Sequence, residues 1–179
     1  MTLEEALAGK DFPDIVRRDL VIVDVPYLSF DAEDRIGQLI VHRDLVEDVR
    51  SIFSRLREMQ FPISQMTPVA AYGWDDDASM AANNSSAFNY RLIAGTDRLS
   101  SHSYGRAIDL NPLQNPYTRL DGVVVPQGAR YETTEPGTVT DAVATIFEQC
   151  GWEWGGRWKN GTDWQHFQKI AVSCESNLM

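Results

Sequence analysis

Two apolar runs near the start of the chain predict a β-hairpin. The first covers residues 20–27 (LVIVDVPY) and is ended by Pro26, and the second covers residues 35–41 (RIGQLIV). The polar residues 31–34 (DAED) between them are suited to a short connection. We therefore expect two paired strands joined by a turn.

From Asp44 onward, the apolar residues recur at the spacing of a helix. They occupy positions 45, 46, 49, 52, 53 and 56. These positions share one helix face, and Asp44 is a suitable N-cap for a helix that ends near Gln60. A second helix is expected over residues 141–149, before a glycine that stops it. A short helix through Met80 should follow the acidic run 75–77.

Three further segments have the pattern of strands. They cover residues 69–74, 86–91 and 106–110, and Pro68 precedes the first of them, where a missing N–H is tolerated. Strands mixed with unevenly spaced helices, without a regular β–α–β rhythm, indicate an α+β fold with a largely antiparallel sheet.

Composition and charge narrow the class of protein. The chain has 179 residues, of which 43% are hydrophobic and 23% charged, as in an ordinary globular domain. Its 16 basic and 26 acidic side chains give a formal net charge of −10, which disfavours nucleic-acid binding. We expect no membrane span, because no run approaches the roughly 20 apolar residues required. The acidic N-terminus does not resemble a signal peptide, and Cys150 and Cys174 are compatible with a disulfide or with two thiols.

The residues suited to catalysis are concentrated in two short segments. They are residues 100–109 (SSHSYGRAID) and residues 162–167 (TDWQHF). Catalytic zinc sites use three nitrogen, oxygen or sulfur ligands and leave a fourth position open. His102, Asp109 and His166 supply such a set. Asp163 would then be a free carboxylate beside the metal, able to act as a general base.

These ligands can meet only if the backbone bends. His102 and Asp109 are seven residues apart, so on one uninterrupted strand they would face opposite sides of a sheet. Gly105 is the residue at which the chain can turn. Asp163 and His166 are three residues apart and also need a bulge or bend.

Simpler interpretations of the same residues are weaker. A histidine with a nearby aspartate is often a structural pair, but one such pair would involve only two of the four residues. A hydrolase triad of Ser100, His102 and Asp109 would leave Asp163 and His166 without a role.

The two segments resemble the M15 family of zinc peptidases, which includes D-alanyl-D-alanine carboxypeptidases, dipeptidases and L-alanyl-D-glutamate endopeptidases. SSHSYGRAID matches the family signature SxHxxGxAxD at all five fixed positions, which are Ser100, His102, Gly105, Ala107 and Asp109. DWQHF is similar to the family's C-terminal ExxH element, with aspartate in place of the glutamate found in many members.

The resemblance implies a hedgehog/DD-peptidase-like α+β domain that holds one Zn²⁺ per chain. It places His102, Asp109 and His166 at the family's ligand positions and Asp163 at the position of its catalytic carboxylate. The implied substrates are the stem peptides of bacterial peptidoglycan, in the cell wall or periplasm. Both carboxypeptidase and endopeptidase action remain open.

Substrate contacts are harder to assign. Many members have a SxYR segment whose arginine binds the substrate carboxylate, whereas the comparable stretch here (AYGW, residues 71–74) has Gly73 at that position. Arg91 is the best substitute as a catalytic-site residue, because a planar guanidinium suits a carboxylate. The other candidates for substrate contact are Ser100, Tyr104, Asn89 and Trp164. Trp164 is one of four tryptophans after residue 151 that could line a cleft or pack in the core.

One domain over residues 1–179 is expected, with an N-terminal extension (1–43) that contains the hairpin and a catalytic core (44–170). We expect a monomer. The alternative function is a catalytically weak, zinc-stabilised binding module of the same fold, as in hedgehog proteins. Asp163 separates the two functions, because a binding module does not need a base.

Overall fold

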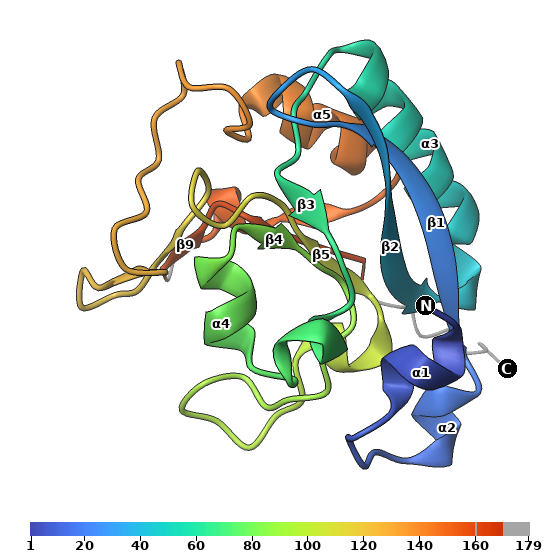
Figure 1. Ribbon diagram of the computed structural model, residues 1–179. Helices are drawn as coiled ribbons and strands as arrows, with labels where there is room; N and C mark the ends of the chain where they lie inside the picture. The colour runs from blue at the N-terminus through green and yellow to red at the C-terminus, as the bar shows by residue number, and fades with distance from the viewer. Residues whose placement is uncertain (160, 170–179) are drawn as a thin grey trace, which may run out of the picture.

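The N-terminal hairpin contains the longest strands that the structure describes. The computed structural model describes residues 1–159 and 161–169. Strands β1 (Leu20–Leu28) and β2 (Asp34–His42) pair antiparallel from end to end, so the predicted hairpin is confirmed. Both strands curve along one side of the molecule (Figure 1). The inner face of the hairpin carries buried apolar side chains, including Val23 and Val25.

Helix α3 (Val46–Glu58) covers the inner face of this hairpin. Its buried residues are those expected from the helical spacing, namely Val49, Ile52, Phe53 and Leu56. The predicted N-cap is wrong, because a 3-10 turn (η1, Arg43–Leu45) precedes the helix and the Nδ1 atom of His42 accepts the N–H of Asp44. The helix ends at Glu58, close to the predicted end, because Gln60 has a φ of +58°, which a helix cannot accommodate.

Helix α5 (Asp141–Gln149) packs beside α3 and has the predicted bounds. Gly151 follows it with a φ of +79°, as expected of a glycine beyond a helix end. On its buried face, the ring of Phe147 stacks on that of Phe167 with the centroids 3.7 Å apart. This stacked pair joins the helical layer to the sheet that carries the candidate ligands.

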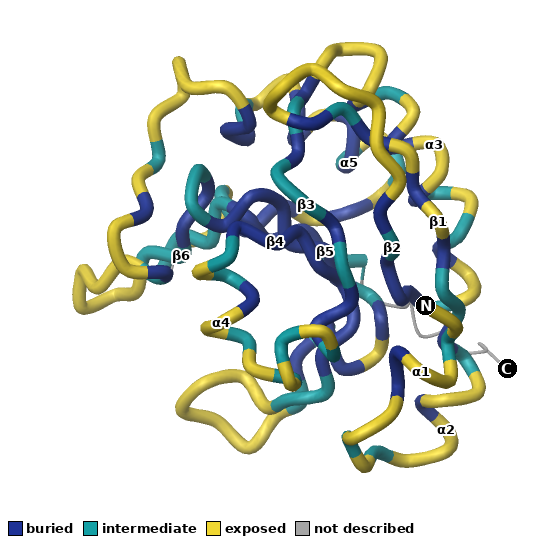
Figure 2. Tube along the Cα trace, viewed as in Figure 1, coloured by how far each residue is buried: buried dark blue, intermediate teal, exposed yellow. Residues whose placement is uncertain are grey.

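Two small antiparallel sheets meet near the C-terminal end of the described chain. In the first, β10 (His166–Gln168) lies between β5 (Ala107–Asp109) and β8 (Glu153–Trp154). In the second, β6 lies between β7 and β9; these are Tyr117–Thr118, Val124–Val125 and Thr162–Asp163. Strand β5 and strand β4 (Asn84–Ser85) are buried along their whole length (Figure 2). The segment 162–168 contains both β9 and β10, so it passes from the second sheet to the first.

Two of the predicted strands are absent from the structure. Residues 69–72 form a 3-10 turn (η2), because Pro68 fixes a helix-compatible start and Gly73 ends it in the left-handed region. Residues 86–91 form only a single bridge, between Ser86 and Asp109. Beyond Ser86, their backbone bonds to the turn that carries His102 instead of to a strand.

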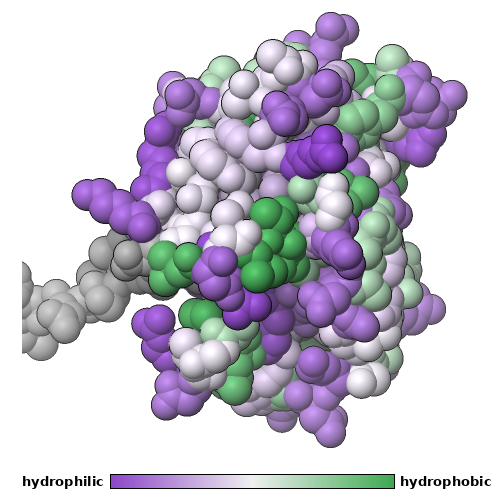
Figure 3. All heavy atoms as spheres, turned by 90° about the vertical axis from the view of Figure 1, so that its left-hand side faces the viewer, coloured by the Kyte–Doolittle hydropathy of each residue, from purple (hydrophilic) through white to green (hydrophobic). Residues whose placement is uncertain are grey.

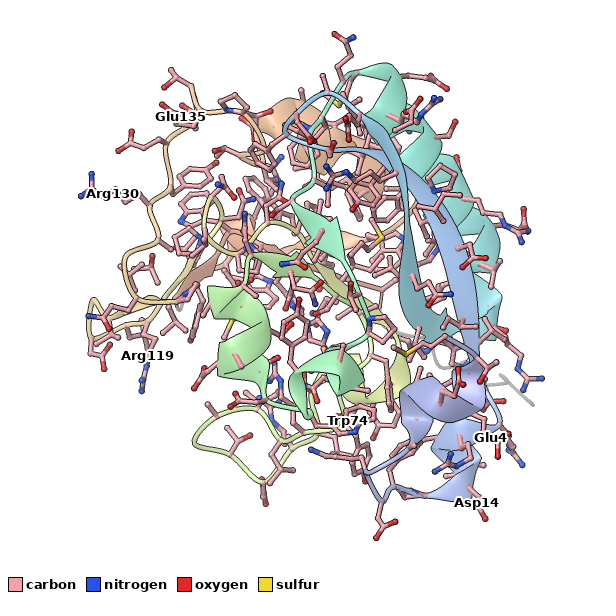
Figure 4. The ribbon with its side chains drawn as sticks, in the orientation of Figure 1. Glu4, Asp14, Trp74, Arg119, Arg130 and Glu135 are labelled. Atoms are coloured by element: carbon pink, nitrogen blue, oxygen red, sulfur yellow. The ribbon has the colours of Figure 1, made fainter. Side chains whose placement is uncertain are left out.

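The remaining elements are short. They are α1 (Leu3–Leu7), α2 (Asp14–Arg17), β3 (Gln65–Met66), α4 (Asp76–Ala81), β4 (Asn84–Ser85), η3 (Ser101–Tyr104) and η4 (Gly155–Arg157). Strands β3 and β4 pair in parallel, unlike the rest. The side chain of Asp75 caps α4 by accepting the N–H of Ala78, so the predicted start of this helix is confirmed. The indole of Trp74 (Figure 4) donates to the carbonyl of Ala8 and so ties this region to α1.

Helices and mostly antiparallel sheets pack around a main hydrophobic core, with a smaller apolar cluster beneath α1 and α2, which confirms the α+β class. Among the described residues, no helix has the length and apolarity needed to cross a bilayer. Cys150 is partly buried at the edge of the core, whereas Cys174 lies outside the described residues, so their relation stays untested.

Candidate active site

A tight turn places His102. The turn η3 begins after Ser100, whose hydroxyl accepts the N–H of His102 at 3.3 Å, and ends at Gly105 with a φ of +63°. Gly105 also contacts strand β2, where the N–H of His42 donates to its carbonyl at 2.9 Å. The predicted bend at Gly105 is confirmed, and it directs the chain from the turn into β5 and Asp109.

We predict that Gly105→Ala destabilises the protein by roughly 2 kcal/mol or more, because it combines backbone strain with overpacking. A Cβ atom at Gly105 would lie 2.6 Å from the backbone nitrogen of His42, and the positive φ adds strain. Gly122 is the matched control, since its φ is +82° but no atom lies within 4 Å of an added Cβ. Urea unfolding of both variants should show a clearly smaller loss for Gly122→Ala; equal losses would contradict the role of the contact with β2.

The three candidate ligands meet at the edge of the first small sheet. Asp109 on β5 is the cross-strand partner of His166 on β10, so their side chains lie on the same face. His166 Nδ1 lies 3.0 Å from Asp109 Oδ1, His102 Nε2 lies 3.2 Å from Asp109 Oδ2, and the two ring nitrogens are 3.1 Å apart. Two ligands at tetrahedral zinc–nitrogen or zinc–oxygen bond lengths are about 3.3 Å apart. The spacing therefore fits a small tetrahedral cation.

The outer nitrogen of each ring is held by an acceptor. His102 Nδ1 contacts the carbonyl oxygen of Ala87, which can only accept, so this nitrogen carries the proton. His166 Nε2 lies 3.4 Å from the side-chain oxygen of Gln168. In the neutral rings, the lone pairs of His102 Nε2 and His166 Nδ1 therefore face one another. Such an arrangement needs a cation, either a proton or a metal ion, between the two rings.

The pKa shifts of Asp109 and His166 also favour a cation between the two rings. Burial alone would raise the pKa of Asp109, but the two histidines hold it well below its usual range. Burial opposes protonation of His166, but the hydrogen bond and charge of Asp109 raise its pKa overall. The carboxylate thus stays ionised and attracts positive charge into a buried site.

Asp163 lies beside the cluster but does not belong to it. It ends β9, and the chain bends at Trp164 and Gln165 before β10 begins at His166, as the three-residue spacing requires. Its Oδ1 atom is buried and has no hydrogen-bond partner in the described part of the chain. Burial and the nearby charge of Asp109 raise the pKa of Asp163 to about 6. A carboxylate with a free oxygen and a pKa near neutrality has the properties of a general base.

A comparison with protein families finds a match for the part of the chain that contains the candidate ligands. Residues 94–169 match the M15 peptidase family model described as D-alanyl-D-alanine carboxypeptidase. Residues 94–169 therefore belong to the M15 peptidase family. This M15 segment is less than half of the chain and contains His102, Asp109, Asp163 and His166. No curated protein and no solved structure matches the chain, so the likeness to hedgehog proteins stays a prediction.

The other predicted site residues lie in different environments. Asn89 is buried and donates to Asp76, and Ser100 is buried as the cap of η3, so both have little surface to offer a substrate. Trp164 is half-buried and stacks on Tyr131, with the ring centroids 3.7 Å apart. Tyr104 is 42% exposed.

Tyr104 also lines a cavity of about 400 Å³, and none of the three candidate ligands lines it. This cavity lies between α2 and η3, with Val16, Leu99 and Arg106 among its walls. Its lining contains none of the four residues that the M15 resemblance places in catalysis. The candidate site is the group of His102, Asp109 and His166, because these side chains have the chemistry of metal ligands.

Arg91 comes from the segment that runs along η3. Its N–H donates to the hydroxyl of Ser103, next to His102. Its guanidinium Nε lies 3.0 Å from a carboxylate oxygen of Asp76, and both side chains are about one-third exposed (31% and 28%). An internal carboxylate thus already neutralises the residue that was predicted to bind the carboxylate of a substrate.

Two residues of the site, Gly155 and Gln168, could not be predicted from the sequence, whereas Trp158 is one of the four tryptophans that were expected to line a cleft or pack in the core. Gly155 packs so closely on the site that an added Cβ would lie 2.9 Å from Asp163 Cβ and 3.3 Å from His166 Cβ. Trp158 is partly exposed, with its ring centroid 5.2 Å from that of His166. Gln168 lies on β10 itself. Of Gly155 and Gln168, only Gly155 has a signal in the sequence, because it belongs to a Gly–Gly pair and glycine permits close approach of the backbone to other groups.

Proposed function

We propose that the protein is a zinc-dependent peptidase that hydrolyses peptide bonds in the stem peptides of peptidoglycan. Membership of residues 94–169 in a peptidase family supports a peptide substrate. His102, Asp109 and His166 would hold one Zn²⁺, and Asp163 would be the general base. The observation that carries the proposal is the pair of facing ring nitrogens, 3.1 Å apart and each within 3.2 Å of Asp109, beside an unpaired carboxylate oxygen.

The role of each residue follows from its surroundings. When bound, zinc supplies a Lewis acid that polarises a carbonyl oxygen and lowers the pKa of water. Asp163 Oδ1 is free to accept the proton of the attacking water and to return it to the leaving amine. The carbonyl of Ala87 and the side chain of Gln168 hold the two imidazoles in the tautomers that leave lone pairs toward the cation.

The position of the scissile bond depends on how a terminal carboxylate is held. The family description favours release of a C-terminal D-alanine, which requires a cation for the free carboxylate. Arg91 is our candidate for that role, and its pairing with Asp76 would have to be shared with the substrate. Cleavage inside the stem peptide needs no such cation.

We predict that Arg91→Ala raises KM for a peptide ending in D-Ala-D-Ala by roughly 10-fold or more, the size expected when a hydrogen bond to a charged group is lost. Arg98→Ala is the matched control, because Arg98 lies in the same loop and is exposed. Steady-state kinetics on this peptide and on one with an amidated C-terminus would separate the roles. Equal kinetics for Arg91→Ala and the parent would remove Arg91 from substrate binding and favour an internal cut.

The zinc content of the protein tests the proposal as a whole. After equilibrium dialysis against zinc, we expect one ion per chain and hydrolysis of stem peptides that a chelator abolishes. A protein that binds one zinc but cuts no stem peptide would be the zinc-stabilised binding module, and one that binds no zinc would contradict both functions.

A further inference from the structure

A single glutamine links the two histidine-bearing segments of the candidate metal site. The side-chain oxygen of Gln168 lies 3.4 Å from His166 Nε2 and accepts the hydroxyl of Ser101 at 2.7 Å. Ser101 immediately precedes His102 in the turn η3. We propose that Gln168 is a positioning residue that orients His166, steadies the turn of His102, and thereby sets the affinity for the metal. This inference rests on the zinc site proposed above.

The orientation of the glutamine amide follows from its partners. The amide nitrogen donates to a carboxylate oxygen of Glu153 at 3.1 Å, and an ionised carboxylate can only accept. The oxygen must therefore face Ser101 and His166. Because an amide oxygen also only accepts, His166 Nε2 carries the proton and Nδ1 keeps its lone pair for the cation. Glu153 thus fixes the tautomer of His166 through Gln168.

The two histidines are held in different ways. His102 Nδ1 contacts a backbone carbonyl, that of Ala87, in a buried segment, so no side-chain substitution can remove this acceptor. His166 depends on a side chain, that of Gln168, which is partly exposed on the central strand of the sheet. In metal sites, partners that hold the outer nitrogen of a ligating histidine typically contribute 10- to 100-fold in metal affinity. Because the partner of His166 is a side chain, its contribution to metal affinity can be measured by mutating Gln168.

Zinc affinity, measured by competition with a chromophoric chelator, tests the inference. We expect Gln168→Ala to bind zinc roughly 10- to 100-fold more weakly than the parent, with an unchanged melting temperature in the metal-free form. Gln149→Ala is the matched control, since Gln149 ends α5 and its side chain bonds to Arg55. It should bind zinc like the parent.

Two further variants separate positioning from a general structural effect. In the double variant Gln168→Glu/Glu153→Gln, the side chain at position 168 still accepts from His166 and Ser101, and the amide at position 153 now donates to it. Zinc affinity should therefore return to within a few-fold of the parent. Ser101→Ala should weaken binding in the parent but add nothing to Gln168→Ala, because the two side chains act through one contact.

Each outcome bears on one proposal. If the parent binds zinc tightly and Gln168→Ala binds it equally well, the positioning role is wrong while the zinc site stands. If the exchanged pair stays as weak as Gln168→Ala, the loss comes from disturbed packing and the inference is again wrong. If the parent itself binds no zinc, the proposed function has failed first.

Discussion

Replacement of Asp163 by asparagine should abolish hydrolysis while leaving the metal in place. Asp163→Asn keeps the size and the hydrogen-bonding capacity of the side chain but cannot accept the proton. We expect kcat to fall by at least the roughly 10²-fold that a general base contributes, with one zinc per chain retained. Its free Oδ1 lies outside the close contacts among His102, Asp109 and His166, which is why the ligands should be unaffected.

The pH dependence of the same variant provides a second, independent test. In the metal-free protein, the pKa of Asp163 is raised from 3.8 to about 6 by burial and by the charge of Asp109. Between these two pH values the folded protein binds more protons than the unfolded chain, so stability falls as the pH rises. Metal-free Asp163→Asn should therefore be more stable than metal-free parent at pH 7 and equal to it below pH 4.

The pH–rate profile of the parent should have an acidic limb, on which activity falls as Asp163 becomes protonated. The base must be ionised, and a bound cation lowers the pKa of Asp163 below its metal-free value of about 6. The acidic limb should therefore lie at or below about pH 6 and disappear in Asp163→Asn. Asp97→Asn, an exposed carboxylate in the M15 segment, should match the parent throughout. Loss of zinc from Asp163→Asn would instead make Asp163 a ligand, and hydrolysis at the parent rate would place the base elsewhere.

Removal of His166 should have the opposite signature, in which metal and activity are lost together. His166→Ala leaves two ligands where a catalytic zinc site needs three, so we expect no stoichiometric zinc and no measurable hydrolysis. A ligand that binds only the folded state stabilises it, by about 2.7 kcal/mol at 100 times its Kd. Added zinc should thus raise the melting temperature of the parent but not that of His166→Ala.

The chain provides its own control for this experiment. It has three histidines, and the third, His42, contacts Arg106 and Asp44 away from the cluster. His42→Ala should keep both zinc and the zinc-dependent rise in melting temperature. Because Asp109 raises the pKa of His166, protons should also compete with zinc, and affinity should fall as the pH is lowered through that pKa. Full zinc occupancy in His166→Ala would contradict the ligand set.

The elements that could be predicted from the sequence are those whose pattern repeats over several turns or residues. Helices α3 and α5 and the β1–β2 hairpin each have enough apolar positions to define a buried face. The four candidate site residues could be found for a different reason, since histidine is rare in this chain and the M15 signature fixes its spacing. Their geometry was only implied by the need for bends at Gly105 and after Asp163.

What the sequence could not predict depends on contacts between distant segments. Strands such as β8 and β9 have two residues each, too few for any alternation, and exist because neighbouring strands pair with them. Residues 86–91 alternate like a strand, but from Asn89 onward their hydrogen bonds go to the turn around His102 and Ser103. Gln168 shows no pattern at all, and its link to Ser101 spans 67 residues of chain.

The M15 segment also carries exposed apolar side chains. In the β6–β7 hairpin, Tyr117 of β6 is the cross-strand partner of Asp163 in β9. The hairpin carries exposed apolar side chains at Leu120, Val123 and Val124. Apolar groups are spread between polar ones over the face seen in Figure 3. Further along the connection to α5, Arg130 and Glu135 point outward (Figure 4).

Mass spectrometry of peptidoglycan fragments, before and after incubation with the zinc-loaded protein, is the most direct measurement of what this protein does. A zinc peptidase should shorten the stem peptides by one defined cut, either the loss of a terminal alanine or a break within the stem. A chelator should prevent that cut and added zinc should restore it. Fragments that keep their masses at every zinc concentration, from a protein that holds one zinc at His102, Asp109 and His166, would contradict the peptidase and leave the binding module.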